Sequence, residues 1–563
     1  MSLSQVKITV QDGGLGEING SGDQNVIHVD VATAAVPNQL VTFSSLNNVA
    51  SSLGLGSGVD DVGYALQQSQ GLVSFLGIEP SVPGAIGAVS HNGTGAGTIT
   101  VSAAPTIQKT IVITSTGVNG VAQYKVLDVD GYSAAFVVPG NADGYIARIP
   151  GTYMHVTFPE GTYTDGYSAT ISTLGTITTV GSLPSISMVA DPIDDYVVSV
   201  TITSSGSTGS AKATFSLDGY NTSPQFILSS SYAIPNSGLV LAASGSFVAG
   251  DVYSFQTCGP SFADSDLSAA LNGLQLVTNE FEMIHVNNKP ATLAAAASTA
   301  VIIDAACQGL LNVYAPVTAS VNVPQNGSVA QSSGSLVVVS GITQTATEAA
   351  FANDASVWVV PCAYDTVIAQ PISGLSLRRN FSWMLMGRLA QISGATDAAW
   401  VQLGGMAAVA VSDLENLDEG LSDSGFSTPT QYPRRSGIFV NQATTLSYKN
   451  NSDYSYVTNR RVMNDCIKVA YDVLVNFLNS KQLVNSKTGF ITQSAANAIE
   501  GQVNNAFNAQ LIQVADPQCS AAECIVNRMN NILISQTLEV TIVITPFGYG
   551  REIELVIGFG LQS

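Results

Sequence analysis

The sequence predicts a multidomain α+β protein in which a long all-β region separates two regions of mixed strands and helices. Its 563 residues exceed the roughly 250–300 at which a single hydrophobic core stops growing. Residues 93–258 are short β-branched runs interrupted by Gly, Pro, Asn and Asp, which is typical of a sandwich or barrel. The last hundred residues show helical and alternating patterns that place both helices and strands.

Residues 1–20 are expected to form an extended N-terminal arm. Val6, Ile8 and Val10 alternate with polar residues, which predicts a half-buried strand, and Asp12-Gly-Gly then predicts a turn.

Residues 21–92 form the first mixed region. Two short strands are predicted at Val26–Val31 and Leu40–Phe43, and a helix is predicted from Val59 to about Leu76.

The all-β region repeats itself. Ile113-Thr-Ser-Thr-Gly117 matches Ile202-Thr-Ser-Ser-Gly206, and later anchors match in the same order, including Asp130-Gly-Tyr132 with Asp218-Gly-Tyr220 and Tyr167-Ser168 with Tyr253-Ser254. These matches predict two tandem β domains of immunoglobulin size, at 93–180 and 181–258. Chance similarity in a region rich in Gly, Ser and Thr is the alternative.

Residues 259–430 form a middle α/β region. The segment Ser261–Leu276 carries Leu267, Leu271 and Leu274 at helical spacing. Residues 318–347 are polar and are expected to form an exposed loop or a weak hairpin.

Residues 431–563 form a C-terminal region with the clearest patterns. One helix is predicted to carry Ile467, Ala470, Tyr471, Leu474 and Leu478 on a single face, and a second helix begins at Ser494. Alternation then predicts a strand from Leu538 to Thr545 and a terminal strand carrying Ile553, Leu555, Ile557 and Phe559, separated by the turn-forming segment 546–550.

The strands predicted at the two chain ends are exposed edges unless something pairs with them. Open edges invite aggregation, so native proteins cover them. Neighbouring copies can cover them by strand addition. The alternative is that both terminal strands close one sheet within the same chain.

The charge balance is inconsistent with nucleic-acid binding. The net charge is −21, and residues 1–288 hold only five of the 19 basic residues, whereas binding to phosphates requires a basic surface. Three arginine pairs stand out (Arg378–Arg379, Arg434–Arg435 and Arg460–Arg461). They indicate either solvated surface or a surface facing a charged partner.

The sequence gives no indication of catalysis, a cofactor or a metal. It has no phosphate-binding loop ending in Lys, no nucleophile elbow and no metalloprotease motif. The six cysteines lack metal-ligand spacing, and the four histidines (His28, His91, His155, His285) are far apart in sequence and are expected to be structural. Gly54–Gly58 resembles a phosphate cradle only loosely, and the acidic residues Asp413, Glu415, Asp418 and Glu419 are expected to form a solvated loop.

No signal peptide and no run of about 18 apolar residues are recognised, so no membrane insertion is expected and the chain is expected to be made in the cytoplasm.

Several segments, in order, resemble the phage tail sheath family. They are Gly250–Thr257 followed by Asp264–Leu276, Leu377-Arg-Arg-Asn-Phe-Ser-Trp383 with Gly387–Ala390, Tyr432-Pro433 with Gly437–Phe439 and Thr444, Asn459–Asp465, Gly489–Ile491 with Glu500, and Leu538 to Phe559 with Pro546-Phe-Gly-Tyr549. The resemblance covers residues 245–563 well and 25–90 weakly.

The resemblance implies a structural subunit of a contractile tail sheath. Such subunits polymerise helically around a tail tube and contract to drive the tube through the host envelope. It also implies that the N- and C-terminal regions form one mixed sheet with flanking helices, with the β domains inserted and facing outward.

The same resemblance implies partners and site residues. The partners are further copies of the chain, a tail tube protein, and baseplate and tail terminator proteins, in a virion tail assembled in the host cytoplasm. Strand exchange between copies is placed at Val6, Ile8, Val10, Ile553, Leu555, Ile557 and Phe559. Arg434, Arg435, Arg460 and Arg461 are placed facing the tube or a neighbouring subunit.

Two other classes of protein remain open. A non-contractile β-rich surface or adhesion protein would explain the tandem β domains but not the helical C-terminal region. An enzyme acting on cell-surface glycan would need paired catalytic carboxylates, and none stands out.

Overall fold

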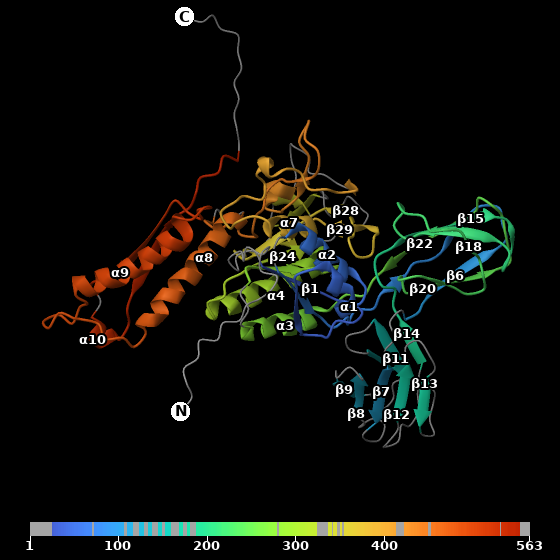
Figure 1. The fold of residues 1–563 in the computed structure, drawn as a ribbon, viewed down its shortest axis with the longest axis horizontal. Helices are drawn as coiled ribbons and strands as arrows, with labels where there is room; N and C mark the ends of the chain where they lie inside the picture. The colour runs from blue at the N-terminus through green and yellow to red at the C-terminus, as the bar shows by residue number, and fades with distance from the viewer. Residues whose placement is uncertain are drawn as a thin grey trace, which may run out of the picture.

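The computed structural model describes residues 25–551 apart from internal gaps (Figure 1). The gaps are 70–71, 106–109, 116–122, 129–132, 138–144, 149–152, 159–167, 173–176, 181–186, 278–280, 324–335, 340–341, 346–349, 352–353, 412–420, 449–451 and 530. A central α/β body lies between a β-rich part and a C-terminal part built from helices and a hairpin. The multidomain α+β class predicted from the sequence is therefore confirmed.

A six-stranded sheet forms the centre of the molecule. Its order is β2 (Leu40–Phe43), β3 (Val73–Gly77), β1 (Val26–Asp30), β23 (Met283–Val286), β24 (Thr318–Asn322) and β27 (Val359–Cys362). All neighbours are parallel except β2, which runs antiparallel to β3. The partners of the N-terminal strands thus come from the middle region, and, as far as residues 431–551 are described, the expectation that the C-terminal region shares this sheet needs correction.

Helices cover both faces of the central sheet. Strands β1, β3, β23, β24 and β27 are buried along their whole length, as expected for a parallel sheet covered on both sides. Helices α3 (Asp264–Gly273) and α4 (Leu293–Asn312) pack on the face that carries Ile27 and Val29. Helices α2 (Ser57–Gln68) and α7 (Ser382–Leu389) pack on the opposite face, and a short α1 (Val49–Leu53) precedes α2 (Figure 1).

Helix α4 is, among the described residues, the one helix long and apolar enough to cross a membrane by length and composition. This finding does not contradict the sequence expectation, which rested on the absence of a run of about 18 apolar residues, because Ser298, Thr299 and Asp304 interrupt α4. Its buried residues, including Ala300, Ile303 and Leu310, pack in the hydrophobic core. One face of the helix is therefore covered by the core, whereas apolar Val301 on its other side is 59% exposed.

A β sandwich is inserted between β3 and α3. One sheet has the order β18 (Phe226–Ile227), β17 (Lys212–Ser216), β15 (Val197–Ser204), β22 (Val252–Cys258) and β4 (Ala85–Ile86), with β5 (Ser90–Asn92) also pairing with β22. The other has the order β19 (Tyr232–Ile234), β20 (Leu239–Ser244) and β6 (Thr98–Ala103), and β16 (Gly206–Ser207) pairs separately with β21 (Ser246–Phe247). Val198, Val200 and Leu241 are buried between the sheets.

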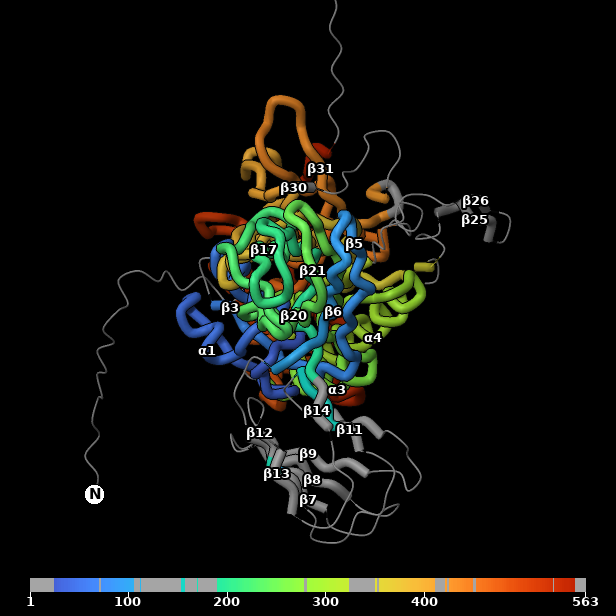
Figure 2. The backbone as a smooth tube through the Cα atoms, turned by 90° about the vertical axis from the view of Figure 1, so that its right-hand side faces the viewer, coloured from blue at the N-terminus to red at the C-terminus, as the bar shows by residue number. Residues whose placement is uncertain are grey.

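A second β domain is inserted in the chain between β6 and β15 of the first, so it is nested in sequence, and its strands lie to one side of the sandwich (Figure 2). Its sheets have the orders β13 (Ile177–Val180), β12 (Ser168–Ser172), β7 (Thr110–Ser115), β8 (Gln123–Asp128), β9 (Ser133–Val137), and β10 (Tyr145–Arg148), β11 (Met154–Phe158), β14 (Ser187–Ala190). The tandem division at 93–180 and 181–258 needs correction, because β6 precedes the nested domain and pairs with β20, which follows it.

The repeated sequence anchors occupy corresponding strands in the two β domains. Ile113 lies on β7, which pairs with β8 and β12, and Ile202 lies on β15, which pairs with β17 and β22. Ser168 and Ser254 lie on the corresponding third strands, β12 and β22. The internal similarity therefore reflects a shared strand order, with one copy nested in the other.

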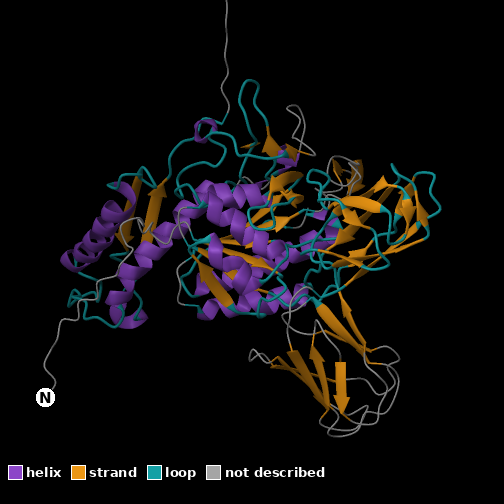
Figure 3. Ribbon diagram, turned by 45° about the vertical axis from the view of Figure 1, so that its right-hand side comes forward, coloured by secondary structure: helices purple, strands orange, loops and turns teal. Residues whose placement is uncertain are grey.

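The remaining strands are short. They are β25 (Leu336–Val339) with β26 (Ile342–Thr345), β29 (Ser376–Asn380) with β28 (Asp365–Ala369) and β30 (Ala410–Val411), and β31 (Pro429–Thr430) with β32 (Phe439–Val440). The C-terminal part contains α8 (Val457–Leu474), α9 (Gln493–Phe507), β33 (Ala521–Val526), α10 (Ile532–Ser535) and β34 (Val540–Thr545) (Figure 3).

Two segments differ from the sequence predictions. The helix predicted from Val59 to Leu76 ends at Gln68, and Leu76 lies on β3. Residues 318–322, expected in an exposed loop or weak hairpin, form the buried strand β24, because their small polar side chains are accommodated beneath the flanking helices.

Candidate functional site

The C-terminal hairpin is a sheet of two strands among the described residues. Strands β33 and β34 pair antiparallel, from Ala521 opposite Thr545 to Val526 opposite Val540. The Asn527 N–H donates to the Glu539 carbonyl at 2.9 Å, and the alternation of an antiparallel ladder then directs the N–H and C=O of Ile542 away from β33. In the described part of the chain β34 has no second partner strand, so its outer edge is available to another strand.

An apolar groove of about 360 Å³ borders this edge. It lies between β34 and the C-terminal half of α8, and Tyr314 stacks on Tyr471 at its margin with ring centroids 4.0 Å apart. Leu478 lines the groove with 71% of its surface exposed. The groove residues on α8 and beyond are Met463, Cys466, Ile467, Ala470, Tyr471, Leu474, Val475 and Leu478, and those on β34 are Ile542 and Ile544.

The chain that follows β34 is held against the central body. The Tyr549 hydroxyl donates to the Ala395 carbonyl at 2.6 Å, and Arg551 pairs with Asp397 at 2.6 Å. The Arg551 guanidinium also lies 3.5 Å from the centroid of the Tyr456 ring. These contacts hold the last described residues, Tyr549 and Arg551, against the central body.

The predicted strand-exchange residues lie outside the described residues. Val6, Ile8 and Val10 precede residue 25, and Ile553, Leu555, Ile557 and Phe559 follow residue 551. These residues therefore remain a prediction from the sequence.

Arg461 does not face a tube or a neighbour, and its assignment there was wrong. It is fully buried and pairs with the equally buried Glu282, with Nη2 to Oε2 at 3.0 Å. Nη2 also donates to the Ile392 carbonyl at 3.0 Å. This pair fixes the first half of α8 to the central sheet.

Arg460 is also buried, so its predicted exposure was wrong. Its guanidinium lies 3.6 Å from the Trp358 ring centroid and 4.8 Å from that of Tyr454. By contrast, Arg434 and Arg435 are exposed, and they remain available to a partner.

Two ion pairs, the first buried and the second partly exposed, join the β sandwich to the central body. Arg379, on β29, donates to Asp194 at 2.9 Å, and Lys289 pairs with Asp195 at 2.9 Å. Both aspartates lie in the segment that leads into β15. Sequence reasoning missed this junction, because each partner is isolated in its own local sequence.

Two histidines and one aspartate converge between the central sheet and α2. His28 and His285 are opposite one another on the adjacent parallel strands β1 and β23, and both face Asp61 on α2. Burial alone would raise the pKa of Asp61, but the two imidazoles hold that pKa well below its usual range. Sequence reasoning treated these histidines separately, since they lie 257 positions apart.

The loop that loosely resembled a phosphate cradle is already filled. The Ser57 hydroxyl, at the start of α2, donates to Asp30 at 2.9 Å, and the Tyr153 ring lies against Gly56. Burial raises the pKa of Asp30 to about 6. A carboxyl group in this position disfavours a phosphate.

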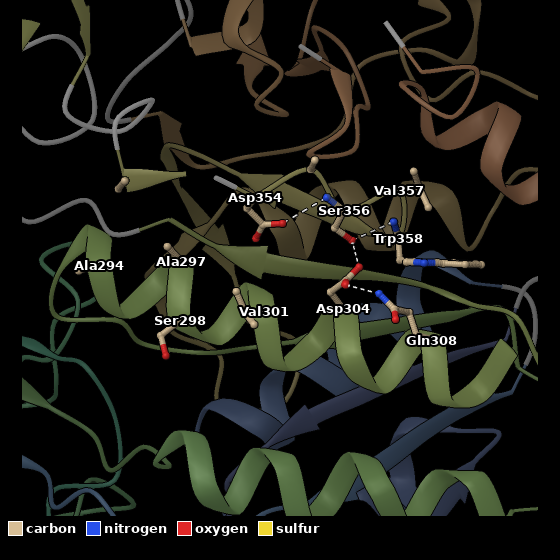
Figure 4. A pocket seen from close by; sticks show the side chains of 12 residues that line it. Ala294, Ala297, Ser298, Val301, Asp304, Gln308, Asp354, Ser356, Val357 and Trp358 are labelled. Carbon is tan, nitrogen blue, oxygen red and sulfur yellow. Dashed lines mark hydrogen bonds between the residues drawn. The ribbon is translucent and has the colours of Figure 1, made fainter. Parts of the chain in front are cut away.

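A hollow of about 680 Å³ lies between α4 and residues 354–358 (Figure 4). Its central carboxylate, Asp304, accepts hydrogen bonds from the Ser356 hydroxyl and, at 2.6 Å, from the Gln308 amide. Much of the remaining lining is alanine, so the hollow gives no basis for assigning a reaction. The acidic residues Asp413, Glu415, Asp418 and Glu419 lie outside the described residues.

The chain belongs to the DUF2586 family. The N-terminal domain of that family matches residues 3–444, and its C-terminal domain matches residues 453–563. The boundary between the two matches falls just before α8. No curated protein sequence matches the chain.

Two solved structures resemble the fold at low similarity. A sheath tail protein from Desulfitobacterium hafniense is 10% identical, with a TM-score of 0.41 over 96% of this chain and 100% of its own. A sheath tail protein from Listeria innocua is 9% identical, with a TM-score of 0.41 over 93% of this chain and 94% of its own. Family membership rests on the two domain matches alone.

Proposed function

We propose that this chain is a structural subunit of a contractile tail sheath and not an enzyme. The subunits polymerise helically around a tail tube and contract to drive it through the host envelope. The proposal starts from the sequence resemblance. The observation that carries it is that β34 pairs with a strand on one edge only, among the described residues, and that its other edge borders an apolar groove.

The hairpin and groove can accept a further strand. The hairpin packs on α9 through β33, but the outer edge of β34 is unpaired among the described residues, and the groove presents apolar side chains such as Leu478, just beyond α8. A third strand on β34 would satisfy the outward N–H and C=O of Ile542 and cover the groove. Each main-chain hydrogen bond contributes about 1 kcal/mol and each newly buried large apolar side chain about 1.5–3 kcal/mol.

The occupant we favour is residues 553–559 of a neighbouring copy. Their alternation of Ile553, Leu555, Ile557 and Phe559 supplies one apolar face of the required length. The chain's own tail leaves from Arg551, which is held at Asp397 on the central body and not beside β34. A tight hairpin back onto β34 would have to break that pair.

Backbone pairing between copies suits a sheath that contracts. Main-chain hydrogen bonds keep two subunits linked while the domains around them rotate, whereas side-chain contacts can separate and form again. Contraction is then a shift between two packings of the same subunits, with the free energy distributed over many copies. The N-terminal arm with Val6, Ile8 and Val10 would add a second linkage of this kind.

The remaining partners follow from the same proposal. They are the tail tube protein and the baseplate and tail terminator proteins, with the subunit located in the virion tail after assembly in the host cytoplasm. The exposed pair Arg434 and Arg435 would face the tube or a neighbour. The nested β domains would face outward, where they do not obstruct the tube.

Tail deletion tests the proposal on the full chain. The purified protein should form helical tubes visible by negative-stain electron microscopy, and deletion of residues 552–563 should abolish them. Substitution of Ile557→Asp should do the same, whereas the matched substitution Asp516→Asn, at an exposed loop outside the groove, should leave the tubes intact. Circular dichroism checks that every variant is folded.

Two results would contradict the proposal. Tubes that persist in both the deletion and Ile557→Asp would remove residues 553–559 from the linkage. A full-length protein that stays monomeric at all concentrations, and binds to cell surfaces, would instead support the adhesion protein.

A further inference from the structure

We propose that His28, Asp61 and His285 hold one divalent transition-metal ion, for which zinc is the expected occupant. Each of the three offers one ligand atom, and these atoms lie within 4.8 Å of one another. The inference is independent of the sheath proposal, because it concerns the interior of the subunit.

The three donor atoms form the triangle that a small metal ion requires. Asp61 Oδ2 lies 2.8 Å from His28 Nδ1 and 2.9 Å from His285 Nδ1, and the two nitrogens are 3.2 Å apart. Tetrahedral zinc with bonds of about 2.0–2.1 Å separates its ligands by roughly 3.3 Å. The three atoms would have to move apart by only a few tenths of an ångström, by the same estimate.

Hydrogen bonds alone satisfy the cluster poorly. His28, Asp61 and His285 are all buried, with 2%, 1% and 0% of their surfaces exposed. Asp61 Oδ1 and His28 Nε2 have no hydrogen-bond partner among the described residues, and an unpaired buried polar atom costs about 1–3 kcal/mol. A metal ion gives Asp61 Oδ1 a role as a second carboxylate donor, and it compensates the buried negative charge.

The surroundings orient the ligands as a metal site requires. His285 Nε2 lies 2.9 Å from the Ser382 hydroxyl, on α7, and a hydrogen bond to the far nitrogen is what fixes the ring of a metal-bound histidine. The two rings project from directly adjacent positions of a buried parallel sheet, and Asp61 projects from a helix packed on it. Little reorganisation is therefore needed to bind the ion.

The donor set and the burial define the kind of site. Two imidazoles and a carboxylate favour zinc, or ferrous iron, over calcium and magnesium, which prefer oxygen ligands. A substrate cannot reach residues this deeply buried, so the ion would be structural. It would tie α2 to β1 and β23 at the centre of the sheet.

Elemental analysis of the full chain tests the site directly. The protein is purified without a polyhistidine tag or chelator, and bound metals are measured by inductively coupled plasma mass spectrometry. We expect close to one equivalent of zinc per chain, and its loss in Asp61→Asn. The matched control is His91→Gln, which removes the histidine of another His–Asp pair, 3.5 Å from Asp251, and should retain the metal.

Two further measurements keep the test independent of whether Asp61→Asn folds. Wild-type protein refolded in chelator should show a lower Tm that added zinc restores, and refolding with cobalt should give the visible absorption bands of a tetrahedral cobalt site. Wild-type protein that contains only trace metal, and whose Tm is unchanged by zinc or chelator, would overturn the proposal and leave a hydrogen-bonded histidine pair.

Discussion

Buried charges in this protein are paired across long sequence separations, and each pair joins two parts of the structure. Arg461 on α8 pairs with Glu282 just before β23, and Arg379 on β29 pairs with Asp194 at the start of the β sandwich. Removing one member of such a pair leaves an uncompensated buried charge, which costs more than the pair itself contributes.

Breaking the Arg461–Glu282 pair should strongly destabilise the protein. We expect Arg461→Met to lower the free energy of unfolding by about 3–5 kcal/mol, measured by urea denaturation. The double variant Glu282→Gln/Arg461→Met should recover much of that loss, because neither charge is then left alone. The exposed Arg434→Gln is the control and should change stability by less than about 0.5 kcal/mol; an equally small effect of Arg461→Met would contradict the assignment.

Asp218 should make the junction between β sandwich and central body sensitive to acid. Burial acts to raise its pKa, but hydrogen bonds from the backbone of Asn221, Ser376 and Tyr220 hold the pKa below its usual value. The bond from the Ser376 N–H, at 2.8 Å, crosses from β29 to the sandwich.

The pKa of Asp218 is lower in the folded protein than in the unfolded chain, where it is about 3.9. Ionised Asp218 therefore adds to the free energy of unfolding above a pH of about 3.9, and this contribution is lost as the pH falls through the folded pKa. The stability difference between wild type and Asp218→Asn should therefore be constant from neutral pH to about 5 and should shrink below about 4. A difference that does not vary with pH, in thermal denaturation across this range, would contradict this role.

At the scale of single residues, the sequence could not identify these partners. The arginine pair at 460–461 was predicted to face outward, since nothing in its local sequence indicates the buried Glu282 or the ring of Trp358. His28 and His285 become neighbours only through the pairing of β1 with β23.

At the scale of elements, the edge of β34 is the feature with a functional consequence. Ile542 combines an outward-facing N–H with a side chain that lines the groove. The sequence predicted both α8 and β34 from periodicity, and it placed Ile467, Tyr471 and Leu474 on one helical face. It could not show that this face lines an open groove, because periodicity does not distinguish a covered face from an uncovered one.

Substitution of Ile542 separates backbone pairing from side-chain packing. Ile542→Pro removes the outward N–H, a change that an edge strand tolerates, whereas Ile542→Ala shortens the side chain and keeps the N–H. We expect the proline variant to raise the critical concentration for polymerisation at least about tenfold relative to the alanine variant. Light scattering measures this concentration, and equal values for the two variants would exclude strand addition at β34.

At the scale of the whole molecule, the nested β domain is separate in the chain from the C-terminal hairpin and groove. It begins after Ala104 and ends at Asp191, and residues from both ends line one small cavity. The internal similarity could be recognised in the sequence, but the nesting could not. It depends on the pairing of β6 with β20, and the entire inserted domain separates these two strands in the chain.

Replacing residues 106–189 with a short glycine-rich linker should leave polymerisation intact. The change removes Tyr153, which packs with Val31 and Ile193, so we expect a modest decrease in Tm. Electron microscopy should show thinner tubes with unchanged axial repeat. Loss of tubes in a folded variant would place the nested domain in the subunit interface.

Cryo-electron microscopy of the tubes formed by the full-length protein would resolve directly which strand, if any, pairs with β34. We predict a third strand alongside β34, contributed by residues 553–559 of a neighbouring subunit, with Leu478 covered by it. Tubes in which the outer edge of β34 is unpaired, or is paired with the tail of the same subunit, would contradict the account.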